Sequence, residues 1–387
     1  MPEVQDIFKL HRPEFLRNYK PSRQQHKALT DIANCRSAVL GGHVDVCDQC
    51  GYTYISYNSC CNRRCPKCQN LKREQWLLDR EQELLDVSYF HIVFTIPDPL
   101  LNELTLRNQE VLYNILFHAA MESLQELAAD PKYLGANIGI LAVLQTWNQT
   151  MMEHPHIHCI VPAGGLSDSG LIWINSSKKF FIPVKVLSRK FRGKFLYLLK
   201  KVWGNGELIF PGNIAYLANS TNFYILLDQL YRIDWVVYSK KPFSTAAYVL
   251  RYLGRYTHKV CISNYRIVSF DNGRVTFKYR DRDKKEKLMT ISAVEFIRRF
   301  LLHILPSRFV KIRYYGFLSN RVRKIKISLC QKILGMKLKP SQKLSPLELI
   351  LESFGFDPTI CPICGGYMQR QLNRDFRSGH APPLIAN

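Results

Sequence analysis

Apolar residues recur along this chain with two alternating periods, which predict helices and strands in turn. A stripe at helical spacing among charged residues predicts a helix and consists of Leu71, Leu77, Leu78, Leu84 and Leu85. Residues 90–96 form a β-branched and aromatic run that stops at Pro97, as expected for a buried strand. A long helix is predicted over 100–127, before Asp130 and Pro131 break the pattern.

The second half of the chain continues this alternation. The predicted elements are strands over 138–147 and 156–161, helices over 187–202 and 243–256, and strands over 266–270 and 274–279. Asn272 and Gly273 separate the last two strands, and this dipeptide is the strongest short signal for a hairpin turn. The pattern as a whole predicts an α/β fold.

Composition and charge narrow the class of protein. With 387 residues, 47% of them hydrophobic, the chain is long enough for two or three folded domains. Lysine and arginine (54) exceed aspartate and glutamate (31), which gives a net charge of +23 and makes nucleic acid the expected partner. The sequence predicts neither a signal peptide nor a membrane span, so we expect a cytoplasmic protein with no membrane partner.

Twelve cysteines in a chain without an export signal indicate metal binding rather than disulfides. Cys47 and Cys50 flank two residues, and Cys65 and Cys68 repeat this spacing after fourteen more positions. Two such turns complete the closed tetrahedral shell of a structural Zn²⁺ ion. The spacing therefore predicts one zinc site formed by these four thiolates, in a zinc-ribbon-like module.

Further cysteines leave alternatives open. A second ion in the same region is possible, with Cys35, His43, Cys60 and Cys61 as candidate ligands. Near the C-terminus, Cys361 and Cys364 form half a site. His380 can add a ligand to it, the pair can dock elsewhere, or both can be free thiols.

Two histidines share one face of a predicted strand. Side chains alternate along a strand, so His156 and His158 point the same way while Ile157 faces the core. Two imidazoles placed like this can hold one divalent cation. The alternative is a solvated polar face.

Two tyrosines are four residues apart on the predicted helix 243–256, so Tyr252 and Tyr256 share a face about one turn apart. Tyr248 lies one turn earlier. Phenols at this spacing can be core residues or nucleophiles. The segment also carries cations suited to a phosphate backbone, namely Arg251, Arg255 and Lys259.

Several separated motifs, in order, resemble one known family. They are Cys47 to Cys68, Phe94 to Pro97, His154 to His158, Tyr252 to Tyr256 and Tyr315 to Leu318. Together they resemble the two-tyrosine HUH rolling-circle transposases of the insertion-sequence-ninety-one group, which carry an N-terminal zinc-binding domain. The resemblance spans nearly the whole chain, from about Cys35 to Cys364.

The resemblance implies a metal-dependent transesterification. His156 and His158 would hold Mg²⁺ or Mn²⁺, and Tyr252 and Tyr256 would attack single-stranded DNA at transposon ends to leave 5′-phosphotyrosine. Tyr248 with Tyr252 is the second choice for the tyrosine pair. Where this family is expected to have a third histidine ligand, the chain has Gln145, whose carbonyl oxygen can also coordinate.

The resemblance also implies a domain order. We expect a zinc-binding DNA-interaction domain over 1–86, an HUH catalytic domain with an antiparallel sheet and flanking helices over 87–300, and a basic region over 301–387. The basic region either lines a groove for a single strand or covers the core. The alternatives to a nucleoid-associated transposase are a non-enzymatic zinc-containing DNA-binding regulator, another nuclease chemistry such as a carboxylate two-metal site, and a degenerate inactive copy.

Overall fold

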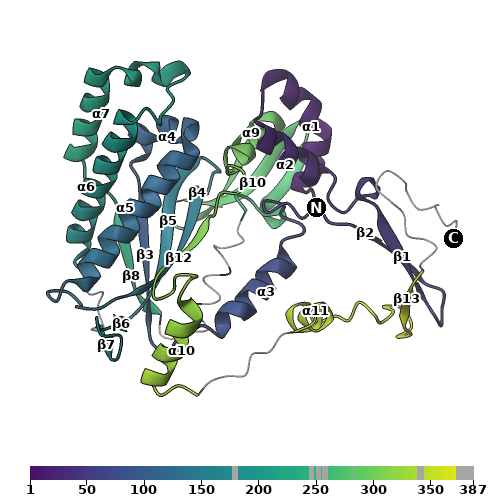
Figure 1. Cartoon of the computed structure of the whole chain (residues 1–387). Coiled ribbons are helices and arrows are strands. Elements are labelled where there is room, and N and C mark those ends of the chain that lie inside the picture. The colour runs from purple at the N-terminus through teal and green to yellow at the C-terminus, as the bar shows by residue number, and fades with distance from the viewer. Residues whose placement is uncertain are drawn as a thin grey trace.

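The computed structural model describes residues 1–176, 182–243, 248–249, 254, 260–281, 283–337 and 344–371, and it gives only the backbone for Pro99 and residues 240–243. Within these ranges the chain forms a large central sheet, two smaller three-stranded sheets and the helices that pack around them (Figure 1). The α/β mixture is confirmed. None of the described helices is long and apolar enough to cross a bilayer.

The central sheet has five strands and is antiparallel throughout. Its strands lie in the order β12 (Ile312–Gly316), β4 (Gly139–Trp147), β5 (Glu153–Pro162), β3 (Tyr89–Thr95) and β8 (Val237–Phe243). The strands predicted over 90–96, 138–147 and 156–161 are confirmed as β3, β4 and β5. Residues 148–152 join β4 to β5 as a short turn, which places these two strands side by side.

A layer of helices covers one face of this sheet (Figure 1). The layer consists of α4 (Asp98–Arg107), α5 (Gln109–Ala129), α6 (Val184–Gly204) and α7 (Ser220–Arg232). Alternate residues of the strands, such as Phe94 and Ile157, enter the core beneath these helices, where both side chains are fully buried. The helix predicted over 187–202 is confirmed within α6.

The single long helix predicted over 100–127 is wrong, because it is divided into α4 and α5 at Asn108. The Asn108 side chain donates to the carbonyls of Leu104 and Ile209 and accepts from the Ile209 backbone N–H at 2.8 Å. Asparagine favours such local bonds to the backbone over a helix interior. The break therefore depends on a loop that lies far away in the sequence.

A second core joins the two N-terminal helices to a distant part of the chain. Helices α1 (Val4–Asn18), α2 (Arg23–Ala33) and α9 (Ala293–Leu302) pack with the sheet formed by β9 (Ile267–Asp271), β10 (Arg274–Arg280) and β11 (Glu286–Ser292). Phe8 meets Phe300 edge to face, with ring centroids 5.1 Å apart. The predicted hairpin is confirmed, since Asn272 and Gly273 both have positive φ (49° and 70°), as a type I′ turn requires.

The third sheet brings the two ends of the chain together. Strands β1 (Gly42–Cys47) and β2 (Thr53–Tyr57) form a hairpin, and β13 (Met368–Arg370) adds to its β1 edge. Figure 1 shows this C-terminal strand beside the N-terminal hairpin. The remaining elements are α3 (Asn70–Glu81), α10 (Arg323–Ile333), α11 (Pro346–Phe354) and the short ribbon β6 (Gly164–Leu166) with β7 (Trp173–Asn175). Helix α3 confirms the predicted leucine-striped helix, which ends at Glu81.

The range predicted as a basic C-terminal region supplies strands to two different sheets, as β12 and β13. Some of its cations serve packing. The Arg313 guanidinium lies 4.1 Å from the ring centroid of Phe117 and donates to the side chain of Asn114 at 2.6 Å, and Arg323 stacks on Tyr314. Burial holds the pKa of Lys311 well below its usual range. These side chains favour the role of covering the core over that of lining a strand groove.

Candidate functional site

His156 and His158 lie side by side on the face of β5 that points away from the helical layer. Their ring centroids are 4.8 Å apart, and their residues are 7% and 8% exposed. On β4 the residues opposite them are Gln145 and Val143. The solvated-face alternative is therefore wrong, because both imidazoles are buried.

The Nδ1 atom of each imidazole is already engaged. His158 Nδ1 shares a hydrogen bond with Nε2 of His91 on β3 at 2.9 Å, and His156 Nδ1 lies 2.6 Å from the carbonyl oxygen of His154. A partner at Nδ1 sets the tautomer and the ring orientation and assigns metal coordination to Nε2. Sequence reasoning missed His91, although a histidine within the apolar run 90–96 was a visible signal.

Gln145 supplies a buried acceptor beside this pair. Its Nε2 donates to the Trp147 carbonyl at 3.0 Å, while its Oε1 is buried and has no hydrogen-bond partner among the described residues. Buried acceptors are nearly always satisfied, and a carbonyl oxygen suits a hard divalent cation. The donor set of two imidazoles and one amide oxygen therefore fits Mg²⁺ or Mn²⁺.

An acidic group also reaches this edge of the sheet, from the start of α4. The Asp98 carboxylate contacts His154 Nδ1, and the His154 ring lies 5.0 Å from that of His156. Asp98 Oδ1 is buried without a hydrogen-bond partner within the described parts. Asp98 was not predicted, but its place directly after Pro97 of the strand motif makes it a further candidate for holding the site.

The predicted tyrosine segment lies mostly outside the described residues. This applies to Tyr252 and Tyr256 and to the three proposed DNA contacts Arg251, Arg255 and Lys259. Tyr248, Val249 and Gly254 are described, and all three are helical. Tyr248, the alternative nucleophile, is 61% exposed.

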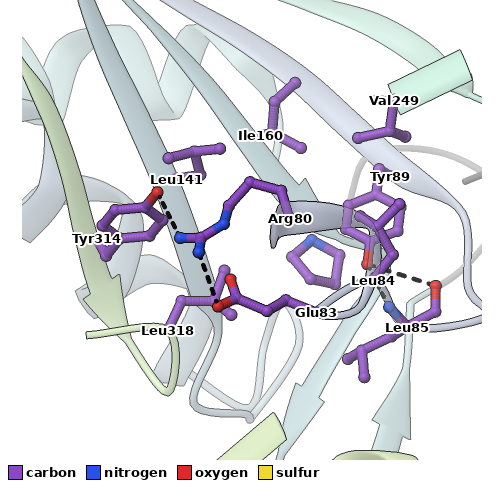
Figure 2. Close-up of a pocket in the computed structure, with 11 residues that line it drawn as sticks. Arg80, Glu83, Leu84, Leu85, Tyr89, Leu141, Ile160, Val249, Tyr314 and Leu318 are labelled. Carbon is purple, nitrogen blue, oxygen red and sulfur yellow. Dashed lines mark hydrogen bonds and ion pairs between the residues drawn. The ribbon is translucent and has the colours of Figure 1, made fainter. Parts of the chain in front are cut away.

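Val249 places the start of this segment on the histidine face of the sheet. It is fully buried against Tyr89, Leu141 and Ile160. Ile160 follows His158 by two residues on the same face of β5, about 7 Å along the strand. Figure 2 shows Val249 above these residues, around a small cavity of about 40 Å³.

Gly254 places the same segment against α3. A Cβ atom built on Gly254 would lie 2.8 Å from Leu77 Cδ1, so the backbone approaches α3 more closely than a side chain comfortably permits. Helix α3 is itself tied to the sheet. Arg80 near its end donates to the Tyr314 hydroxyl of β12 at 3.0 Å and pairs with Glu83 (Figure 2).

A cleft of about 850 Å³ opens between the start of α3 and the β9–β11 sheet, beside Gly254. Cationic side chains dominate its charged lining, which consists of Arg73, Arg266, Lys278, Arg280 and Glu286. Tyr265, which is 78% exposed, adds an aromatic surface. Cations beside exposed rings are typical of surfaces that bind single-stranded nucleic acid.

The cysteines form two clusters, and the predicted single site of Cys47, Cys50, Cys65 and Cys68 is corrected. The first cluster consists of Cys35, Cys60, Cys65 and Cys68, and the second of Cys47, Cys50, Cys361 and Cys364. In each cluster the four sulfur atoms lie within 4.8 Å of one another. The two N-terminal Cys-x-x-Cys turns therefore do not share an ion, because each finds partners elsewhere. Neither His43 nor Cys61 belongs to these clusters.

The first cluster lies within the second core and supports structural zinc. Cys35 and Cys65 are fully buried there, and Cys60 Sγ is 3.8 Å from Cys68 Sγ. A hydrogen bond from Cys60 lowers the pKa of Cys35 to about 7, which favours the thiolate that a metal needs. Arg64, next to Cys65, is buried over the Trp147 ring at the end of β4. The cluster is thus packed against the strand that carries Gln145.

We expect Cys65→Ser to remove a zinc ion and to lower the unfolding midpoint by about 5 °C or more, because structural zinc contributes its binding energy to folding. Metal analysis and thermal denaturation of the purified protein measure both effects. Cys61→Ser is the matched control, since Cys61 is exposed and outside both clusters. A Cys65→Ser protein with undiminished zinc and stability would contradict the assignment.

Comparison with known proteins matches two family models to this chain. Residues 7–96 match a transposase zinc-binding domain, and residues 139–326 match a putative transposase family. The first range contains the first cysteine cluster, and the second contains Gln145, His156 and His158. Cys361 and Cys364 lie outside both ranges.

Two relatives are similar over most of their length. A putative transposase, y4qJ, of Sinorhizobium fredii is 46% identical over 370 residues, which are 94% of this chain and 93% of that protein. The transposase for insertion sequence element IS801 of Pseudomonas savastanoi pv. phaseolicola is 29% identical over 350 residues, 88% of this chain and 82% of that protein. No solved structure matches the chain.

Proposed function

Because this chain belongs to the IS91 family of transposases with an N-terminal zinc-binding domain, we propose that it cuts and rejoins single-stranded DNA through tyrosine nucleophiles beside the paired histidines. Transposases of this kind act on DNA at transposon ends. The proposal adds the chemistry: HUH-type transesterification with 5′-phosphotyrosine intermediates, as rolling-circle transposition needs.

The observation that carries the proposal is the convergence on one face of the central sheet. Buried His156 and His158, with the Gln145 oxygen beside them, share this face with Val249, which precedes Tyr252 by three residues. Helical residues three apart lie on neighbouring positions of one face. A helix that continues from Val249 would hold Tyr252 near the histidines and Tyr256 one turn further on.

In the proposed reaction a phenol oxygen attacks the phosphorus atom of the scissile phosphodiester. The phosphorus–oxygen bond to the 3′-side nucleotide breaks, the phenolic proton is lost, and the leaving strand keeps a free 3′-hydroxyl. A divalent ion held by His156, His158 and Gln145 would neutralise charge on the phosphate. Attack by a 3′-hydroxyl on the phosphotyrosine reverses the step, so rejoining needs no ATP. Two tyrosines allow one strand end to be held while a second is cut.

Several features support single-stranded DNA as the substrate. The net charge of +23 attracts the phosphate backbone, and the cationic cleft with Tyr265 begins beside Gly254 of the tyrosine segment. Arg251, Arg255 and Lys259 lie in that segment and are proposed to contact the DNA near the cut.

The rival chemistry of a carboxylate two-metal site finds little support. Within the described ranges, groups of three or more histidine, cysteine or acidic ligands are the two cysteine clusters. A regulator without catalysis would not need a buried histidine pair with an unsatisfied amide oxygen beside it. The degenerate inactive copy is left to experiment.

The test is a search for covalent protein–DNA adducts. Purified protein is incubated with Mn²⁺ and labelled single-stranded oligonucleotides that tile the DNA flanking its gene, then run on a denaturing gel. We expect a labelled band that migrates with the protein and disappears when the ion is chelated. Cleavage without an adduct would indicate a two-metal nuclease, and binding without cleavage would indicate a regulator or an inactive copy; either result would overturn the proposal.

A further inference from the structure

We propose that Cys47, Cys50, Cys361 and Cys364 bind a second structural zinc ion, which clasps the C-terminal segment 344–371 onto the N-terminal hairpin. This site unites two halves that are more than 300 residues apart, and its C-terminal half lies outside both family matches. The inference does not depend on the DNA chemistry proposed above.

The sulfur geometry fits one tetrahedral ion. Zinc–thiolate bonds of about 2.3 Å place the sulfur atoms of a tetrahedron about 3.8 Å apart. Here Cys47 Sγ is 3.4 Å from Cys364 Sγ, and Cys50 Sγ is 3.7 Å from Cys361 Sγ. These distances are far longer than the ~2.05 Å of a disulfide bond. The four thiols are therefore arranged as ligands.

The two halves of the site have the same backbone design. Each Cys-x-x-Cys pair is followed by a glycine with positive φ, Gly51 at 69° and Gly365 at 76°. The N–H of each glycine donates to the carbonyl of the first cysteine of its pair, at 3.2 Å and 3.0 Å. Such a turn aims both thiolates of a pair at one point. The repeated design indicates that both halves are shaped for the same ion.

The halves also approach each other closely. A Cβ atom built on Gly366 would lie 2.9 Å from Asp48 Oδ1 and 3.0 Å from Cys47 Sγ, so the second turn fits against the first because this residue has no side chain. The Asp48 carboxylate accepts the Tyr367 backbone N–H at 2.9 Å, and the Asp48 N–H donates to the Tyr367 carbonyl at 3.0 Å.

Protein contacts alone hold this segment weakly. β13 has three residues and pairs with β1 from Asp45 to Cys47. Of the four cysteines, Cys50 and Cys364 are exposed, and little apolar surface is buried around them. A ladder this short is marginal in water, whereas thiolate coordination of zinc is strong enough to order small domains. The ion would therefore supply most of the attachment.

The clasp also positions α11. This helix packs against α3, the helix whose Leu77 contacts Gly254 of the tyrosine segment (Figure 1). Residues 344–371 thus run from α11, beside α3, to the clasp on the N-terminal hairpin. Release of the clasp would free α11 while leaving the first cysteine cluster in place.

The first test is the zinc content of the full-length protein. We expect two zinc ions per chain in the parent protein, and one in the double variant Cys361→Ser with Cys364→Ser. Cys61→Ser, which removes an exposed thiol outside both clusters, should keep two. A parent protein with one ion, or a double variant with two, would overturn the proposal.

The second test uses Cys50→Ser, which alters only the N-terminal half of the site. Limited proteolysis should then release a C-terminal fragment containing α11 at least about tenfold faster, because the opened state is more populated once the ligand-held contact is lost. Circular dichroism checks that the remaining fold is intact. An unchanged rate of release in Cys50→Ser would contradict the clasp, since a separate C-terminal arm would not respond to a change at residue 50.

Discussion

Replacing both Tyr252 and Tyr256 with phenylalanine is expected to abolish the covalent protein–DNA adduct while leaving the fold intact. Phenylalanine keeps nearly the same packing volume but lacks the oxygen that attacks phosphorus. Activity and stability should therefore separate. The measurement is the labelled adduct on a denaturing gel, together with the thermal midpoint of each variant.

The single variants refine this expectation. Each should still form an adduct on one strand through the phenol that is left, but transfer between two DNA ends should be lost. Tyr248→Phe is the matched control, because Tyr248 lies one turn earlier and is 61% exposed. Mapping the phosphotyrosine by mass spectrometry identifies the nucleophile directly. An adduct on Tyr248 would move the catalytic pair one turn towards the N-terminus.

Replacing His156 or His158 with alanine is the second change with a large expected effect. Each variant should lose at least about a hundredfold in cleavage, because outer-shell partners alone already account for 10–100-fold and these side chains would contact the ion itself. DNA binding should stay largely intact, since affinity depends on the basic surface. Cleavage rates and a DNA-binding titration at fixed salt measure the two effects separately.

His91 provides a graded version of this experiment. It bonds to His158 Nδ1 and acts through that ring as a positioning residue. His91→Asn should weaken the metal dependence about tenfold to a hundredfold and should be rescued by a higher Mn²⁺ concentration. His118→Ala, at an exposed position of α5, is the control. Native cleavage rates in both His156→Ala and His158→Ala would place the metal site elsewhere.

Local patterns in the sequence were sufficient for the strands and turns near the candidate site. The run 90–96 and the hairpin at Asn272 and Gly273 were predictable because steric preferences within a few residues decide them. The shared face of His156 and His158 also follows from the alternation of side chains along any strand. These features required no knowledge of the neighbours in space.

The neighbours themselves were decided by the tertiary structure. The sequence shows that Cys47 with Cys50 and Cys65 with Cys68 form metal-binding turns, but the partner of each turn depends on which distant segment folds against it. The same reason explains the break at Asn108, which bonds to the backbone of Ile209, and the pairing of His91 with His158, which follows from the register of two strands. Local preference therefore determined what each segment of this chain can do, and long-range packing determined with which partner it does so, because strand register and domain closure depend on contacts summed over the whole core.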